Sequence, residues 1–88
     1  MTTVMEVLGS QDAPAGIVTI APEDTVVTAA RTMRQHNIGC LVVADADGRI
    51  TGIISERDIT GRVVARLADP AKTLVRDVMT NRSVALDR

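Results

Sequence analysis

The sequence predicts an α+β domain in which a small three-stranded sheet packs on two helices, with extensions at both ends. Two apolar-periodic segments of helical type alternate with short runs of strand type, in the order strand, helix, strand, strand, helix. The 88 residues include no Phe, Tyr or Trp, so the core must consist of aliphatic side chains and Met. A chain of this length buries only about 60–65% of the surface that its unfolded form exposes, so self-association would help its stability.

The first strand is predicted at residues 16–20, where β-branched residues follow a glycine and precede a proline. A helix follows, because Asp24 or Thr25 can cap free N–H groups and acidic residues favour the positive end of the helix dipole. Asn37 and Gly39 should end this helix. Its predicted apolar stripe has the spacing i, i+3, i+4 and i+7 and consists of Val26, Ala29, Ala30 and Met33.

The second and third strands are predicted at residues 40–44 and 50–54. The first of them is a continuous apolar run, short enough to be a strand buried on both faces. The residues between them, Asp-Ala-Asp-Gly at 45–48, have the composition of a turn, and Gly48 can adopt a positive φ. The two strands should therefore pair as an antiparallel hairpin.

The second helix is predicted to begin at Ser55 and to end at Asp69 and Pro70. Gly61 weakens it by about 1 kcal/mol relative to alanine. The pattern Ser55-x-x-Asp58 fits a variant capping box, which by itself needs no ligand. The apolar positions of this helix step by four and are Ile59, Val63 and Leu67.

The end of the chain repeats its beginning. Residues 75–79 match residues 4–8, and residues 84–86 match residues 18–20. Because internal repetition indicates paired or stacked units, we expect a complete unit and part of another. The expected boundaries are 1–69 for the complete unit and 70–88 for a linker with the start of a second, truncated unit.

Composition excludes several classes of partner. The formal net charge is -1, which provides no general attraction to nucleic acid or to anionic lipid, and stacking of bases on aromatic side chains is not available. No apolar run approaches the roughly 20 residues that span a bilayer. The single cysteine, Cys40, fits a reducing compartment, so we expect a cytoplasmic protein.

No catalytic or metal site is predicted. Cys40 lies in an apolar run without a basic neighbour and is interpreted as a small buried hydrophobe. His36 suits the negative end of a helix and lacks metal-ligating partners at a suitable spacing. Asp45 and Asp47 resemble a fragment of a calcium loop, but the closing glutamate is missing, so the turn is favoured. We expect no enzyme and no required cofactor.

Five segments, in this order and spacing, resemble the cystathionine-beta-synthase (CBS) domain family. They are the helix at 22–33, Ile-Gly-Cys-Leu-Val-Val at 38–43, the turn at 47–48, Gly-Ile-Ile-Ser-Glu-Arg-Asp at 52–58, and Val-Arg-Asp-Val-Met at 75–79. The resemblance implies a β-α-β-β-α unit that occurs as tandem pairs packed sheet to sheet. It also implies a regulatory role, with AMP, ADP, ATP or S-adenosylmethionine bound between paired units.

The resemblance also implies which residues would contact such a ligand. In family members that bind, the stretch that corresponds to Ser55 and Asp58 contacts ribose and phosphate. A carboxylate in the first turn can accept ribose hydroxyls, a helix N-terminus favours phosphate, and Arg57 or Arg62 could pair with that phosphate. The residues against which the base would lie are Val18, Thr19, Ile38, Gly39 and Cys40.

Three hypotheses of function remain open at this point. The first is regulation by an adenine nucleotide bound between two units, which shifts their packing and is sensed by a partner or effector. The second is a structural module that dimerises without a ligand. The third is an accessory fragment of an enzyme subunit. Because one chain lacks a complete second unit, we expect a homodimer in which the unit of one chain packs on that of another.

Overall fold

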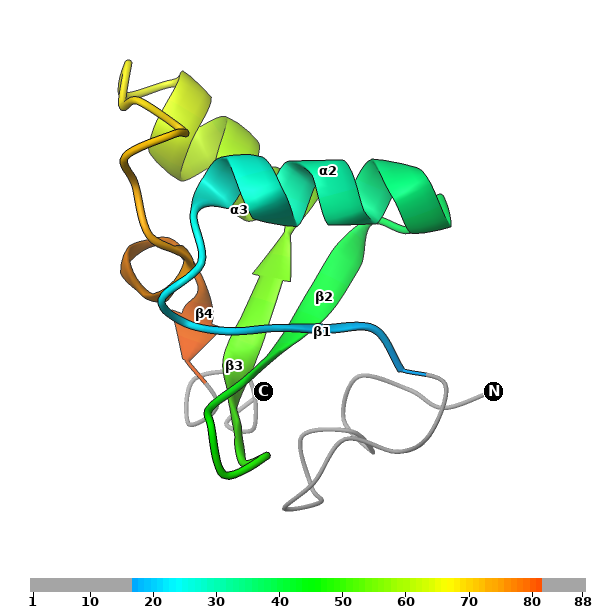
Figure 1. The fold of residues 1–88 in the computed structure, drawn as a ribbon. Helices are drawn as coiled ribbons and strands as arrows, with labels where there is room; N and C mark the ends of the chain where they lie inside the picture. Colours follow the sequence, from blue (N-terminus) through cyan, green and yellow to red (C-terminus); the bar gives the residue numbers. More distant parts are fainter. Residues whose placement is uncertain (1–16, 82–88) are drawn as a thin grey trace.

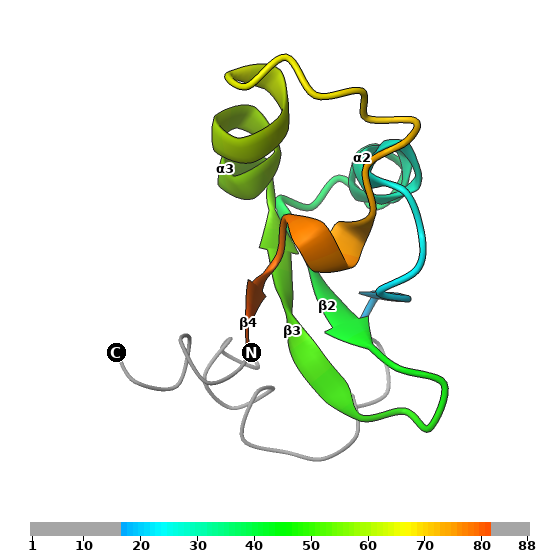
Figure 2. The same ribbon diagram turned by 90° about the vertical axis from the view of Figure 1, so that its left-hand side faces the viewer.

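The computed structural model describes residues 17–81 and has a single mixed sheet with the strand order β1-β2-β3-β4. Strand β1 is parallel to β2, and the other two pairs are antiparallel. Figures 1 and 2 show the helices α2 and α3 next to each other at one side of the sheet. The elements are β1 (Thr19–Ile20), α2 (Val26–His36), β2 (Cys40–Ala44), β3 (Ile50–Ser55), α3 (Glu56–Ile59), a π-helical turn (Thr60–Val64), a 3-10 turn (Val75–Asp77) and β4 (Thr80–Asn81).

The predicted α+β class and the order strand, helix, strand, strand, helix are confirmed. The sheet nevertheless has four strands and not three, because Thr80–Asn81 pairs with β3 as a further antiparallel strand. The first strand is also shorter than the predicted range 16–20 and comprises only Thr19–Ile20. The predicted strand at 84–86 and the matching segment at 4–8 lie outside the described residues.

The sheet carries apolar side chains on both faces. Leu41 and Val43 in β2 belong to the core between sheet and helices, whereas Val42 between them belongs to a second cluster on the opposite, outer face. This alternation follows from the two-residue period of a strand. The buried members of the helix-side core are Ile20, Val26, Ala29, Met33, Leu41, Val43, Ile54, Val63, Val75 and Val78, and those of the outer cluster are Val42, Ile50 and Ile53.

Helix α2 begins and ends at the residues that the sequence predicts. Thr25 is its N-cap, since its Oγ1 accepts a hydrogen bond from the Thr28 N–H at 3.3 Å. Asn37 is the C-cap in the left-handed region, with φ 54°. Of the predicted stripe, Ala30 does not belong to the core, because it is exposed on the flank of the helix that faces α3.

The second helix differs from its prediction. Its α-helical part is only Glu56–Ile59, and Thr60–Val64 continues as a π-helical turn. Hydrogen bonds in a π-helix span five residues and not four. Leu67 lies beyond this turn, at a left-handed residue that ends the helical segment, and is 93% exposed, whereas Ala68 packs against the core. The prediction that Leu67 lies in the core is wrong for this reason.

The backbone at Leu67 predicts a stabilising substitution. Leu67 has φ 59°, and its N–H and that of Ala68 donate to the carbonyls of Val64 and Val63, which is the helix ending that glycine favours. Leu67→Gly should therefore raise the free energy of unfolding by about 1 kcal/mol and Tm by roughly 4–8 °C, measured by thermal unfolding. Leu67→Ala keeps the unfavourable φ and should leave Tm nearly unchanged. A lower Tm for the glycine variant would contradict this prediction.

Candidate functional site

The pair Ser55 and Asp58 forms the predicted capping box at the end of β3 and the start of α3. The Asp58 N–H donates to Ser55 Oγ at 3.2 Å, and Asp58 Oδ2 accepts from the Ser55 N–H at 2.9 Å and from Ser55 Oγ at 3.0 Å. The second carboxylate oxygen, Oδ1, accepts from Thr80 Oγ1 at 3.3 Å. The cap thus fixes one oxygen of Asp58 and directs the other toward β4.

The register of the sheet places three of the predicted ligand residues on its outer face. Cys40 pairs with Ser55, and Thr19 pairs with Val42, which belongs to the outer cluster. Since residues two apart in a strand share a face, Thr19, Cys40 and Ser55 lie on the side away from α2. Together with Asp58 they form what we call the outer-face site.

Cys40 is exposed, so its interpretation as a buried hydrophobe is wrong. It is the first residue of β2, where the strand emerges from beside the end of α2. The outer cluster begins two residues further on, at Val42. The Cys40 thiol therefore lies outside the outer cluster and is not covered by it.

Three other predicted residues are oriented differently. Val18 and Ile38 pack against the helix-side core, and the Gly39 carbonyl accepts a hydrogen bond from the Glu56 N–H at 3.0 Å. Ile38 and Gly39 also line a pocket between α2 and α3. The other residues of this pocket are Ala30, Met33, Arg34, Asn37, Glu56, Ile59 and Thr60. The predicted base-binding residues are thus divided between the two faces of the sheet.

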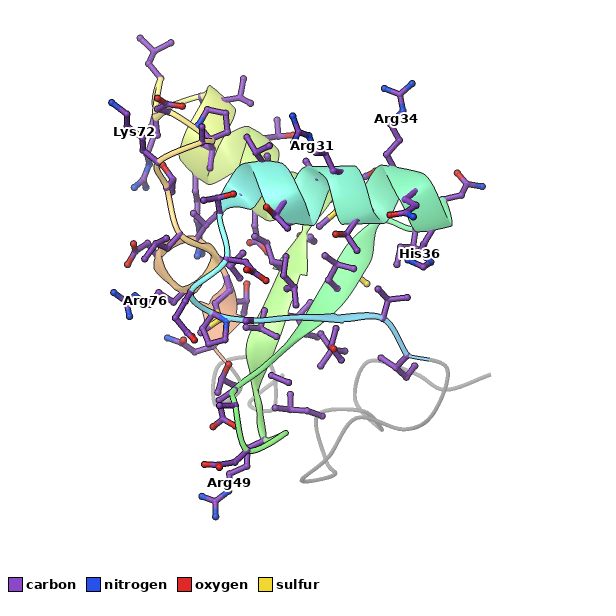
Figure 3. All side chains as sticks on the ribbon, viewed as in Figure 1. Arg31, Arg34, His36, Arg49, Lys72 and Arg76 are labelled. Carbon is purple, nitrogen blue, oxygen red and sulfur yellow. The ribbon has the colours of Figure 1, made fainter. Side chains whose placement is uncertain are left out.

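Of the two arginines considered for a phosphate, one has a structural role. Arg62 Nη1 donates to the carbonyls of Val78 at 2.9 Å and Met79 at 3.2 Å, and so holds the segment that leads into β4. Arg57, in the first turn of α3, is exposed. Figure 3 shows other basic side chains at separate places, on α2, at the hairpin and along the linker. Its labelled basic residues are Arg31, Arg34, His36, Arg49, Lys72 and Arg76.

The sequence analysis did not identify Thr80 as part of this region, and it included Gly52 only as the first residue of the motif at 52–58. A Cβ on Gly52 would lie 2.4 Å from the Thr80 carbonyl oxygen, so only glycine allows β4 to come this close to β3. A glycine inside a strand pattern is a signal for such a close approach and could have pointed to this contact. The sequence around Thr80 has no pattern that predicts a two-residue strand.

The loop between β2 and β3 is a turn, as predicted. Asp45 Oδ1 accepts from the N–H groups of Asp47 and Arg49, each at 3.0 Å, and Gly48 has φ 83°. Within residues 17–81, no three His, Cys, Asp or Glu side chains come together as a group that could hold a metal ion. In the same residues, no helix has the length and apolar character that crossing a bilayer requires.

Comparisons with known proteins agree with this geometry. The family model described as CBS domain matches residues 14–65. Hypoxic response protein 1 of Mycobacterium tuberculosis is 33% identical over 70 residues, which are 80% of this chain and 46% of that protein. A CBS-domain containing protein from Agrobacterium tumefaciens has a structure with TM-score 0.68 at 35% identity, over 88% of this chain and 56% of the other.

A CBS domain protein from Pyrobaculum aerophilum, solved in complex with AMP, has the same fold, with TM-score 0.68 at 24% identity over 74% of this chain and 50% of that one. The chain therefore spans about half the length of each of these relatives. CBS domain proteins act as regulatory modules. With the fold, the capping box and the family model in agreement, the chain belongs to the CBS domain family.

Proposed function

We propose that this chain is a regulatory module that binds an adenine-containing ligand at the outer-face site, with Asp58 as the acceptor of the ribose hydroxyls. The observation that carries the proposal is the position of the Asp58 carboxylate. Its Oδ2 is fixed by the helix cap, and its Oδ1 accepts from a neutral hydroxyl, that of Thr80. A carboxylate held in this way forms strong hydrogen bonds to ligand hydroxyls without first losing rotamer freedom.

The other predicted residues have roles in the same proposal. The base lies against Thr19 and Cys40, which are both exposed on the outer face. The residues directly before these two strands, Val18, Ile38 and Gly39, supply backbone contacts to the ligand. Ser55 contacts the ribose or phosphate, and the exposed Arg57 pairs with phosphate. The candidates are AMP, ADP, ATP and S-adenosylmethionine, and the AMP complex of the Pyrobaculum aerophilum protein supports this class of ligand.

The proposal includes an assembly. Residues 1–69 form one complete unit, and residues 70–88 form a linker and the start of a second. Two chains associate as a homodimer, the ligand lies between paired units, and occupancy is transmitted to a partner or effector. No cofactor is required, and neither nucleic acid nor membrane is a partner. The module works in the cytoplasm, which the single Cys40 supports because thiols remain reduced there.

Thermal unfolding of the wild type and of Asp58→Ala, with each of the four adenine ligands at fixed protein concentration, tests this function. A ligand at a hundredfold excess over Kd adds about 2.7 kcal/mol of stability. Since each kcal/mol raises Tm by roughly 4–8 °C in a domain of this size, the wild type should gain roughly 10–20 °C with its ligand. Asp58→Ala should lose this gain. It should also lower Tm without ligand, because losing the cap costs about 1 kcal/mol.

The matched control is Asp69→Ala. Asp69 Oδ1 accepts from the Ala71 N–H at 2.9 Å, so this variant also loses a local carboxylate contact to the backbone, but at the boundary with the linker. It should keep the full rise in Tm with ligand. The absence of any rise for the wild type with all four ligands would contradict the proposed function.

A ligand-free dimerisation module is the second candidate. The observation that favours it is the exposure of two large apolar side chains after α3, Val64 at 63% and Leu67 at 93%, which a second unit would cover. This function predicts a Tm that rises with protein concentration and does not respond to the four ligands. The same unfolding series therefore distinguishes the two candidates.

A further inference from the structure

Strand β4 is hydrogen-bonded to the Asp58 carboxylate, which in the proposed function binds the ligand. Thr80 Oγ1 donates to Asp58 Oδ1, and Ser55 already supplies two donors to Oδ2. Both oxygens of Asp58 thus have donors from the protein itself. A ribose hydroxyl that takes the acceptor position of Oδ1 now used by Thr80 has to displace the Thr80 hydroxyl.

The segment that ends in β4 is firmly held before Thr80 and has fewer contacts at Thr80 and Asn81 among the described residues. Val75 and Val78 are 0% and 2% exposed, and Arg62 donates to the carbonyls of Val78 and Met79. Among residues 17–81, β4 is held beyond this anchor by its two-residue pairing with β3 and by the bond from Thr80 to Asp58. Loss of the Thr80 bond would leave β4 held by its two-residue pairing with β3, while the anchor stays in place.

The same segment also covers the start of α2. The N–H groups of Val26 and Val27 donate to the carbonyls of Thr73 at 2.9 Å and Pro70 at 3.0 Å. The Val75 N–H donates to the Asp24 carbonyl at 2.8 Å. Figure 2 shows this stretch running from α3 past α2 to β4. One continuous piece of chain thus connects the first helix with Asp58.

We propose that Thr80 is a latch on the outer-face site: its hydroxyl and the ribose compete for Asp58 Oδ1, so that ligand binding detaches β4 from β3. This inference rests on the proposed function and adds the route by which occupancy reaches the chain after residue 81. Thr80 acts here as a positioning residue through Asp58. Its hydroxyl lowers ligand affinity, whereas Asp58 raises it.

The test compares the wild type with Thr80→Val and Thr80→Ser in the full chain. Valine has the shape of threonine without the hydroxyl, and serine keeps the hydroxyl. We measure the affinity for AMP, ADP, ATP and S-adenosylmethionine by titration calorimetry. Because a hydrogen bond to a charged group has to be given up on binding in the wild type, Thr80→Val should bind about fivefold more tightly. Thr80→Ser should bind like the wild type.

Hydrogen exchange of the amides in the β3 and β4 pairing gives a second readout. The bound ligand should accelerate exchange of the Thr80 and Asn81 amides in the wild type, and Thr80→Val should show this faster exchange without ligand. Equal affinities for the three proteins, or slower exchange of these amides with ligand, would overturn the latch and leave the proposed function standing. If Thr80→Val binds one of the four ligands and the wild type binds none, the result supports both the latch and the proposed function. Failure of all four ligands to bind the wild type and Thr80→Val overturns both.

Discussion

Replacement of Gly52 by alanine should lower the free energy of unfolding by about 1–3 kcal/mol. A Cβ at this position would lie 2.4 Å from the Thr80 carbonyl oxygen and 3.1 Å from Met79 Sδ. The carbonyl belongs to the backbone and cannot turn away as a flexible side chain can, so β4 must move from β3. Denaturant unfolding should show the loss of stability, and hydrogen exchange should locate it at β4.

Gly61→Ala is the matched control for this prediction. Gly61 lies in the π-helical turn, and a Cβ there meets no atom within 4 Å. Alanine at this position should raise the free energy of unfolding by up to about 1 kcal/mol, since it loses less backbone entropy on folding. A Gly52→Ala variant as stable as the wild type would show that β4 does not need the close approach to β3.

The elements with local signals could be predicted from the sequence. Thr25 and Asn37 bound α2 because each can satisfy backbone groups of the helix end from its own position. Gly48 marks the hairpin because its φ of 83° is accessible to glycine without strain. Ser55 and Asp58 are three residues apart and form their cap within one turn. Each of these structures depends on neighbours in the sequence.

The elements that could not be predicted depend on contacts between distant parts of the chain. The bond between Thr80 and Asp58 joins residues 22 apart in sequence, and β4 has only two residues. The end of the second helix is also invisible to a four-residue period, which placed Leu67 in the core, because the helical segment ends at Val64 and Leu67 has a left-handed backbone. For β4, the pairing with β3 determines the backbone and local propensity does not.

The candidate base-binding residues show a further limit of reading motifs along a sequence. Ile38 and Gly39 come directly before β2, which begins at Cys40, so the alternation of faces along the strand does not extend to them. Ile38 packs toward the helices while Cys40 is exposed on the outer face. Only the register with β3, in which Cys40 lies opposite Ser55, shows which of them belong beside Asp58.

Ile54→Ala should cause the largest loss of stability among these substitutions, about 2–5 kcal/mol. Ile54 is 0% exposed, pairs with Leu41 and lies in the helix-side core. Its truncation removes apolar contacts and leaves a cavity between sheet and helices that the packed surroundings fill only in part. Denaturant unfolding measures the loss. A loss below 1 kcal/mol would contradict the assignment of the main core to this face.

Ile53→Ala is the neighbouring control, and it separates stability from binding. Ile53 has 9% exposure and belongs to the smaller outer cluster, so its truncation should cost less than that of Ile54. If the outer face binds the adenine ligand, Ile53→Ala should change the ligand affinity, because Ile53 pairs with both Val42 and Thr80 beside the site. Ile54→Ala, on the other face, should keep its affinity in the fraction that remains folded. The reverse pattern would place the ligand on the helix side of the sheet, where Ile54 lies.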